Sequence, residues 1–124
     1  MARILVVDDS PTETYTISGI LSRHGFEVIT AECAESGIRA TRENMPDLVL
    51  MDIVMPGING FQATRQLTKD PQTSSIPVVI LSNKGQEIDR VWGKRQGARG
   101  YLVKPVDEAL LIATIKQVLA DVGD

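Results

Sequence analysis

The chain has 124 residues, a length typical of one domain with a single core. Hydrophobic residues make up 43% and charged residues 23%, as in an ordinary globular protein. The net charge of −3, without a basic run, argues against a nucleic-acid binder, and no apolar stretch is long enough for membrane insertion. The single cysteine excludes an internal disulfide, and "MARILVVDD" reaches two carboxylates too early for a signal peptide. We therefore predict a cytoplasmic location.

Five short runs predict β-strands. The runs at 4–7 ("ILVV"), 48–51 ("LVLM") and 78–81 ("VVIL") are apolar without alternation, which is typical of strands covered on both faces of a parallel sheet. Weaker runs at 26–30 ("FEVIT") and 101–103 ("YLV") predict two flanking strands.

The segments between these strands are long enough for helices. "SPTE" predicts a helix start, with Ser10 as the cap, Pro11 in the first helical position and Glu13 closing a capping box. Three threonines then favour a strand, but parallel strands need a long crossover, so we predict a helix. Four more helices are indicated by apolar residues within 37–45, 61–67, 88–95 and 111–122.

A strand followed by a helix, repeated five times, predicts an α/β fold. Right-handed crossovers favour an open parallel sheet with helices on both faces. We expect one domain over residues 1–124. In such folds ligands bind at the carboxyl ends of the strands, near the switch point in strand order.

Three aspartates follow predicted strands. Asp8 and Asp9 come after the first strand, and Asp52 comes after the third. If these strands are neighbours, the carboxylates converge and raise one another's pKa values, which a divalent cation would relieve. A site with oxygen ligands only suits Mg²⁺, which readily shares its coordination sphere with a phosphate.

Two further polar residues end strands at the same predicted edge. Ser82 follows "VVIL", and Lys104 follows "YLV". A hydroxyl and an ammonium beside a metal and carboxylates suit a phosphoryl group, with one carboxylate as the nucleophile. Each residue alone has an ordinary explanation as a cap, turn or surface residue. Together they favour a phosphoryl-transfer site.

The motifs "ILVVDDS", "PDLVLMDIVMPGINGF", "IPVVILS" and "GARGYLVKPV" resemble receiver domains of two-component response regulators, the CheY-like superfamily. The resemblance covers essentially the whole chain. It implies a flavodoxin-like doubly wound fold with strand order 2-1-3-4-5. Within the family, "MDIVMPGINGFQATRQLTKD" and "VWGKRQGARGYLVKPVDE" look most like the PilH type of pilus-based chemotaxis systems, which control twitching motility.

The resemblance also implies roles for individual residues. Asp52 matches the phosphoacceptor. Asp8 and Asp9 match the acidic pair that binds Mg²⁺ (or Mn²⁺), together with Asp52 and the backbone carbonyl of Val54. No other cofactor is expected.

The remaining matches lie on the last two strands. Ser82 matches the hydroxyl that follows the phosphoryl group, and Lys104 matches the family's lysine, with Lys104–Pro105 as its cis peptide bond. Tyr101 matches the aromatic switch residue. A switch surface is then expected on the fourth helix, fifth strand and fifth helix. Trp92 lies on that fourth helix, where an exposed and a buried side chain are equally compatible with the sequence.

The function implied is that of a stand-alone regulator, without an output domain. It would accept a phosphoryl group from a CheA-like histidine kinase and then bind a downstream pilus-motor or signalling protein, or act as a phosphate sink. We expect no enzymatic activity beyond its own phosphoryl transfer and dephosphorylation, and a monomer or weak phosphorylation-dependent dimer. Val54 has no polar side chain to orient an attacking water and Lys84 could cover the phosphoryl group, which predicts a phosphorylated state that lasts minutes.

Three alternatives are compatible with parts of the pattern. A haloacid-dehalogenase-type phosphatase needs a D-x-D motif after the first strand, whereas Asp8 and Asp9 are adjacent. A flavodoxin-like FMN carrier shares the strand order, but the two aspartates would repel its phosphate. A receiver that docks without phosphorylation is disfavoured by the complete acidic set.

Overall fold

The computed structural model describes residues 1–123 and contains one five-stranded sheet, in which every neighbouring pair of strands is parallel. The strand order is β2-β1-β3-β4-β5, which confirms the predicted doubly wound topology. The strands are β1 (Arg3–Val7), β2 (Glu27–Ala31), β3 (Leu48–Met51), β4 (Val78–Ser82) and β5 (Gly100–Val103).

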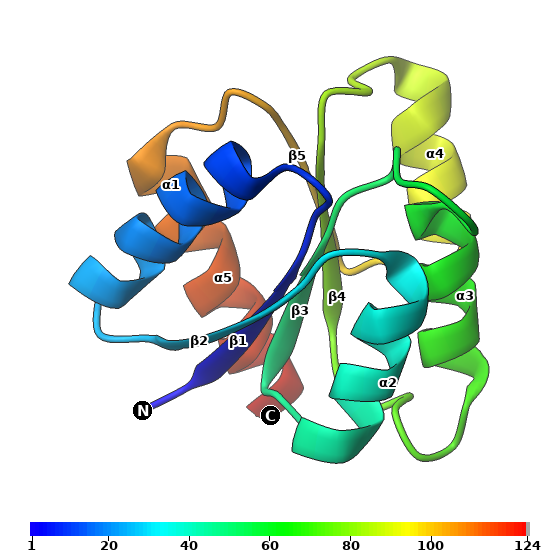
Figure 1. Cartoon of the computed structure of the whole chain (residues 1–124), viewed down its shortest axis with the longest axis horizontal. Helices are drawn as coiled ribbons and strands as arrows, with labels where there is room; N and C mark the ends of the chain where they lie inside the picture. Colours follow the sequence, from blue (N-terminus) through cyan, green and yellow to red (C-terminus); the bar gives the residue numbers. More distant parts are fainter. Residues whose placement is uncertain (124) are drawn as a thin grey trace.

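Five helices cover the two faces of the sheet. Figure 1 shows α1 and α5 on one face and α2, α3 and α4 on the other. This is the two-sided arrangement that right-handed crossovers produce. The helices are α1 (Pro11–Arg23), α2 (Ala34–Asn44), α3 (Gly60–Lys69), α4 (Glu87–Arg95) and α5 (Glu108–Gly123). None of them is long and apolar enough to cross a membrane.

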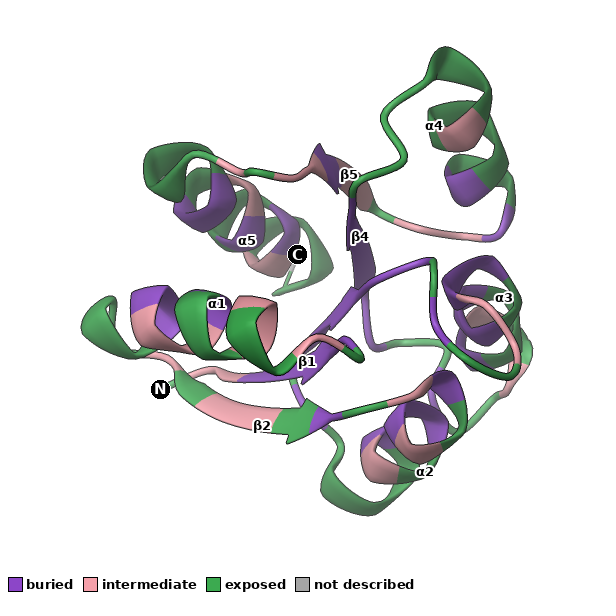
Figure 2. Cartoon of the chain, turned by 45° about the horizontal axis from the view of Figure 1, so that its top comes forward, coloured by how far each residue is buried: buried purple, intermediate pink, exposed green. Residues whose placement is uncertain are grey.

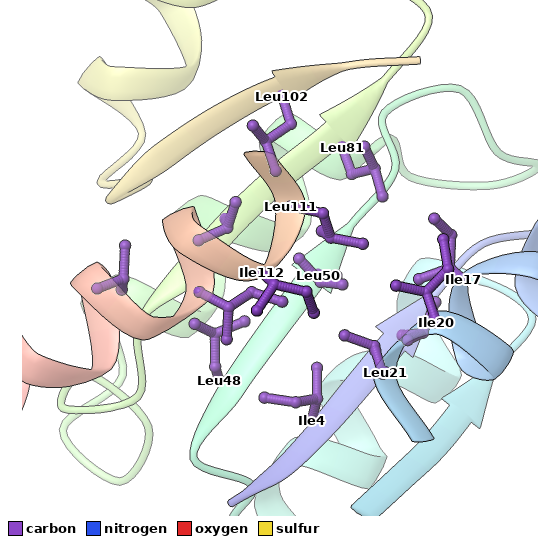
Figure 3. Close-up of a cluster of buried hydrophobic side chains, with 14 residues drawn as sticks. Ile4, Ile17, Ile20, Leu21, Leu48, Leu50, Leu81, Leu102, Leu111 and Ile112 are labelled. Carbon is purple, nitrogen blue, oxygen red and sulfur yellow. The ribbon is translucent and has the colours of Figure 1, made fainter. Parts of the chain in front are cut away.

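Alternate residues of the central strands enter different cores. Ile4 and Val6 of β1 pack with α1 and α5, whereas Leu5 and Val7 pack with α2 and α3. Figure 3 shows the first core, where side chains from the sheet meet those of α1 and α5. Because both faces of each central strand are buried, its sequence is continuously apolar, as predicted.

The start of α1 differs from the prediction in one respect. Pro11 takes the first helical position, and the Ser10 hydroxyl accepts a hydrogen bond from the Glu13 N–H at 3.3 Å. The predicted capping box is wrong, however, because the Glu13 carboxylate does not return to Ser10. It turns to Lys104 instead, and the Ser10 N–H donates to Asp8 Oδ1 at 2.9 Å.

The helix predicted over 88–95 is present as α4, but its apolar side chains face outward. Ile88 is 68% exposed and Trp92 is 47% exposed, and Gly93 is the only buried residue of this helix. Figure 2 shows most of α4 in the colour of exposed residues. The structure therefore decides the open question about Trp92: its side chain is exposed.

Candidate functional site

Polar residues from four strands meet at the carboxyl edge of the sheet. Asp8 follows β1, Asp52 follows β3, Ser82 ends β4 and Lys104 follows β5. Asp8, Asp52 and Ser82 are all at least nine-tenths buried. Parallel strands place their carboxyl ends at one edge, so residues far apart in sequence become neighbours.

The ammonium of Lys104 lies among carboxylates. Its Nζ is 2.7 Å from Asp8 Oδ2 and 3.5 Å from Asp52 Oδ2, and it also donates to the carboxylate of Glu13. Only 7% of the Lys104 side chain is exposed. A charge this deeply buried needs paired partners, and the carboxylates supply them.

A metal ion would find oxygen ligands in the same place. Carboxylate oxygens of Asp8, Glu13 and Asp52 lie within 4.8 Å of one another. An oxygen-only set of this kind fits a hard cation such as Mg²⁺. Asp9 is exposed and lies outside this group, whose third carboxylate is that of Glu13, and the role of Asp9 as a metal ligand stays a prediction.

Sequence reasoning missed Glu13 because its position in "SPTE" fits a cap equally well. The available signal was its place in the first turn of the helix that follows the acidic pair. Val54 has an exposed side chain, and the role of its backbone carbonyl as a metal ligand stays a prediction.

The electrostatics of Asp52 reflect its burial. Burial raises the pKa of Asp52 above its usual range. The Lys104 ammonium opposes this shift in pKa, and the nearby Asp8 carboxylate reinforces it. The Ile53 N–H donates to Asp52 Oδ1 at 2.8 Å and stabilises the charged form. Burial alone would lower the pKa of Lys104, but hydrogen bonds to Asp8 and Glu13 outweigh it, so that pKa is raised. A carboxylate and an ammonium thus face each other in a largely buried site.

A glycine allows α3 to begin directly beside Asp52. The Gly60 N–H donates to the Ile53 carbonyl at 2.9 Å. A Cβ added to Gly60 would lie 1.9 Å from the Asp52 carbonyl oxygen, closer than atoms can approach. Any larger residue would move either the helix or the backbone that carries the Asp52 carboxylate.

The residues on β4 and β5 line the other side of the site. The Ser82 hydroxyl is buried and accepts a long hydrogen bond from the Lys84 N–H at 3.4 Å. Tyr101 is half-buried, and its hydroxyl donates to the Lys84 carbonyl. Burial, with the nearby Asp89 charge, raises the pKa of Tyr101 to about 12. The Lys104–Pro105 peptide bond is cis.

Comparison with known proteins agrees with this geometry. The model of the response regulator receiver domain matches residues 4–116. The chain belongs to this family. It is 63% identical over 120 residues to PilH of Pseudomonas aeruginosa, covering 97% of this chain and 99% of that protein. It is 38% identical over 117 residues to the phosphate regulon regulator PhoB of Escherichia coli, covering 94% of this chain and 51% of PhoB.

Solved structures give the same family. Chemotaxis protein CheY4 of Vibrio cholerae matches with a TM-score of 0.89 and 30% identity, over 95% of this chain and 98% of that one. A CheY-like receiver domain protein of Methanospirillum hungatei matches with a TM-score of 0.92 and 26% identity, over 99% and 97%. This protein is thus a PilH-type receiver, a class of signalling proteins rather than classical enzymes, and the phosphatase and FMN-carrier alternatives lose their support.

Proposed function

We propose that this receiver accepts a phosphoryl group on Asp52 from a CheA-like histidine kinase. The observation that carries the proposal is the buried Asp52 carboxylate, which faces the Lys104 ammonium at 3.5 Å within an oxygen cluster suited to Mg²⁺. A compact ammonium beside Asp52 can balance the charge that a phosphoryl group would add there, which supports this assignment.

The chain's own residues have distinct parts in the transfer. An oxygen of Asp52 attacks the phosphorus of phosphohistidine, the phosphorus–nitrogen bond breaks, and the imidazole leaves with the bond's electron pair. Lys104 balances the charge added at Asp52, and the Ser82 hydroxyl donates to a phosphoryl oxygen. Bound Mg²⁺, held by Asp8, Asp9, Asp52 and the Val54 carbonyl, would neutralise charge on the phosphoryl oxygens.

The response would be a change of protein partner. Phosphorylation draws Ser82 inward, Tyr101 follows, and the surface formed by α4, β5 and α5 changes. The exposed Ile88 and Trp92 make this surface suitable for a protein partner. The likeness to PilH supports a pilus-motor or related signalling protein as that partner, with phosphate drainage from a shared kinase as the second role. We propose a cytoplasmic monomer that dimerises at most weakly.

The decisive experiment is the intact mass of the protein after incubation with acetyl phosphate, with and without Mg²⁺. We expect one phosphoryl adduct that requires Mg²⁺ and is absent from Asp52→Asn. Asp121→Asn is the matched control, because Asp121 is exposed on α5 and should leave the adduct unchanged. A protein that binds Mg²⁺ without forming an adduct would favour phosphorylation-independent docking, and a protein that does neither would contradict the site.

A further inference from the structure

The Lys104 ammonium makes its two shortest contacts with carboxylates other than that of Asp52. It pairs with Asp8 and with Glu13, while Asp52 Oδ2 is farther away, at 3.5 Å. An ammonium has three protons to donate and strongly prefers short contacts to charged acceptors. Two neighbouring carboxylates therefore hold it closer to themselves than to the proposed phosphoacceptor.

Glu13 reaches this ammonium from the rim of the site. Its side chain is 37% exposed, whereas the side chains of Asp8 and Asp52 are 6% and 9% exposed. Its backbone is fixed in the first turn of α1 by the Ser10 hydroxyl. Among the ion pairs of residues 1–123, Lys104 is the one partner of Glu13. The contact joins residues 91 positions apart, so it is a product of the fold rather than of the helix start.

We propose that Glu13 is a positioning residue that restrains the Lys104 ammonium on the α1 side of the site until a phosphoryl group on Asp52 draws it away. The inference rests on the proposed phosphorylation of Asp52. The added phosphoryl charge attracts the ammonium more strongly than the single charge of Glu13 does, but separating the Glu13–Lys104 pair costs free energy. Glu13 would thus tune how readily the site accepts a phosphoryl group.

The restraint can be tested without any phosphoryl chemistry. Glu13→Gln keeps the shape of the side chain and removes its charge. Glu43→Gln is the matched control, because Glu43 is exposed on α2 and has no ion pair within the described chain. We expect the Lys104 ammonium protons, followed by NMR in the metal-free protein, to exchange with solvent several-fold faster in Glu13→Gln and at the wild-type rate in Glu43→Gln. An unchanged rate in Glu13→Gln would overturn the proposal.

The consequence for the site is tested with beryllofluoride, a phosphoryl analogue, at saturating Mg²⁺. For an ion pair in which only the Glu13 side chain is partly exposed, we expect about fivefold tighter binding in Glu13→Gln, and no change in Glu43→Gln. The gain should vanish when Lys104→Met is combined with Glu13→Gln, because Glu13 acts through the ammonium. A gain that persists in that background would mean that the Glu13 charge repels the analogue directly, and would overturn the positioning role.

These measurements separate the two proposals. If the exchange rate responds to Glu13→Gln while the wild type binds no analogue, the Glu13–Lys104 restraint stands and the proposed function fails. If the wild type binds the analogue and Glu13→Gln binds it no better, the proposed function stands and the positioning role fails. The exchange measurement needs no Lys104 variant, so it remains decisive if Lys104→Met does not fold.

Discussion

The hydroxyl of Tyr101 on β5 donates a hydrogen bond to the backbone carbonyl of Lys84, in the connection between β4 and α4. This bond ties the half-buried aromatic ring to the segment that follows Ser82, whose own hydroxyl accepts from the Lys84 N–H. The backbone of Lys84 is therefore held by hydrogen bonds at both its N–H and its carbonyl. The connection leads directly into α4, the helix with the most exposed apolar side chains of the fold.

Tyr101→Phe removes only this hydroxyl. We expect faster amide hydrogen exchange in residues 83–86 and a loss of about 1 kcal/mol or less in the free energy of unfolding, the usual net value of one hydrogen bond. Tyr15→Phe is the matched control, because Tyr15 is 82% exposed on α1. Equal exchange rates in both variants would show that the Tyr101 hydroxyl does not restrain the connection.

Gly93 is the buried residue of α4 and packs closely against the sheet. An added Cβ would lie 2.9 Å from Ile80 Cδ1 and 3.1 Å from the Tyr101 ring. We expect Gly93→Ala to destabilise the protein by about 1–3 kcal/mol in urea denaturation, because overpacking outweighs the better helix propensity of alanine.

Gly19→Ala provides the matched control in α1. Its Cβ would meet only the flexible end of Arg23, at 3.7 Å. We expect it to stabilise the protein by about 0.5–1 kcal/mol through helix propensity alone. If Gly93→Ala stabilises the protein as Gly19→Ala does, the close packing at Gly93 leaves room for a Cβ and the prediction is wrong.

The buried charge of Asp52 gives a pH-dependent prediction. Because burial raises the pKa of Asp52 in the folded protein above its ordinary value of 3.8, ionising this carboxyl opposes folding. The stability that this carboxyl contributes when protonated is fully present below its ordinary pKa. It is lost as the pH rises through the higher pKa of the folded protein, where the carboxyl ionises. We therefore expect metal-free Asp52→Asn to be more stable than the wild type near neutral pH, with the difference shrinking as the pH falls toward 3.8.

Urea denaturation with a chelator at about pH 7 and about pH 4 measures this difference. Asp121→Asn, on the exposed side of α5, controls for a change of net charge alone. A wild type that is more stable than Asp52→Asn near neutral pH would show that pairing with Lys104 outweighs the cost of burying the charge.

The lifetime of the phosphorylated state should depend on Val54. Its side chain is 64% exposed beside the site and has no polar group to orient an attacking water. We expect the wild-type phosphoryl adduct to last minutes, and Val54→Asn to shorten its lifetime several-fold because the amide can hold a water near the phosphorus. Decay of the adduct followed by intact mass measures this, with Val122→Asn, exposed on α5, as the control. Decay of the wild-type adduct within seconds would contradict the prediction.

Much of the fold and part of the site followed from local sequence. The continuous apolar runs of β1, β3 and β4 predict strands buried on both faces, because no polar residue interrupts either face. Once the strands are parallel, the residues that end them must share an edge. The sequence therefore predicts that Asp8, Asp52 and Lys104 share an edge, whereas only the family resemblance implies the strand order.

Tertiary structure decided where individual side chains point. The spacing of Glu13 fits a helix cap, yet its carboxylate pairs with the Lys104 ammonium. A buried ammonium from a distant part of the chain binds a carboxylate more strongly than a backbone N–H does. Trp92 lies on an apolar stripe that predicts burial as readily as exposure, and the position of α4 at the edge of the sheet leaves it exposed. Spacing along the chain determines which residues share a face, but only the packed neighbours determine what that face meets.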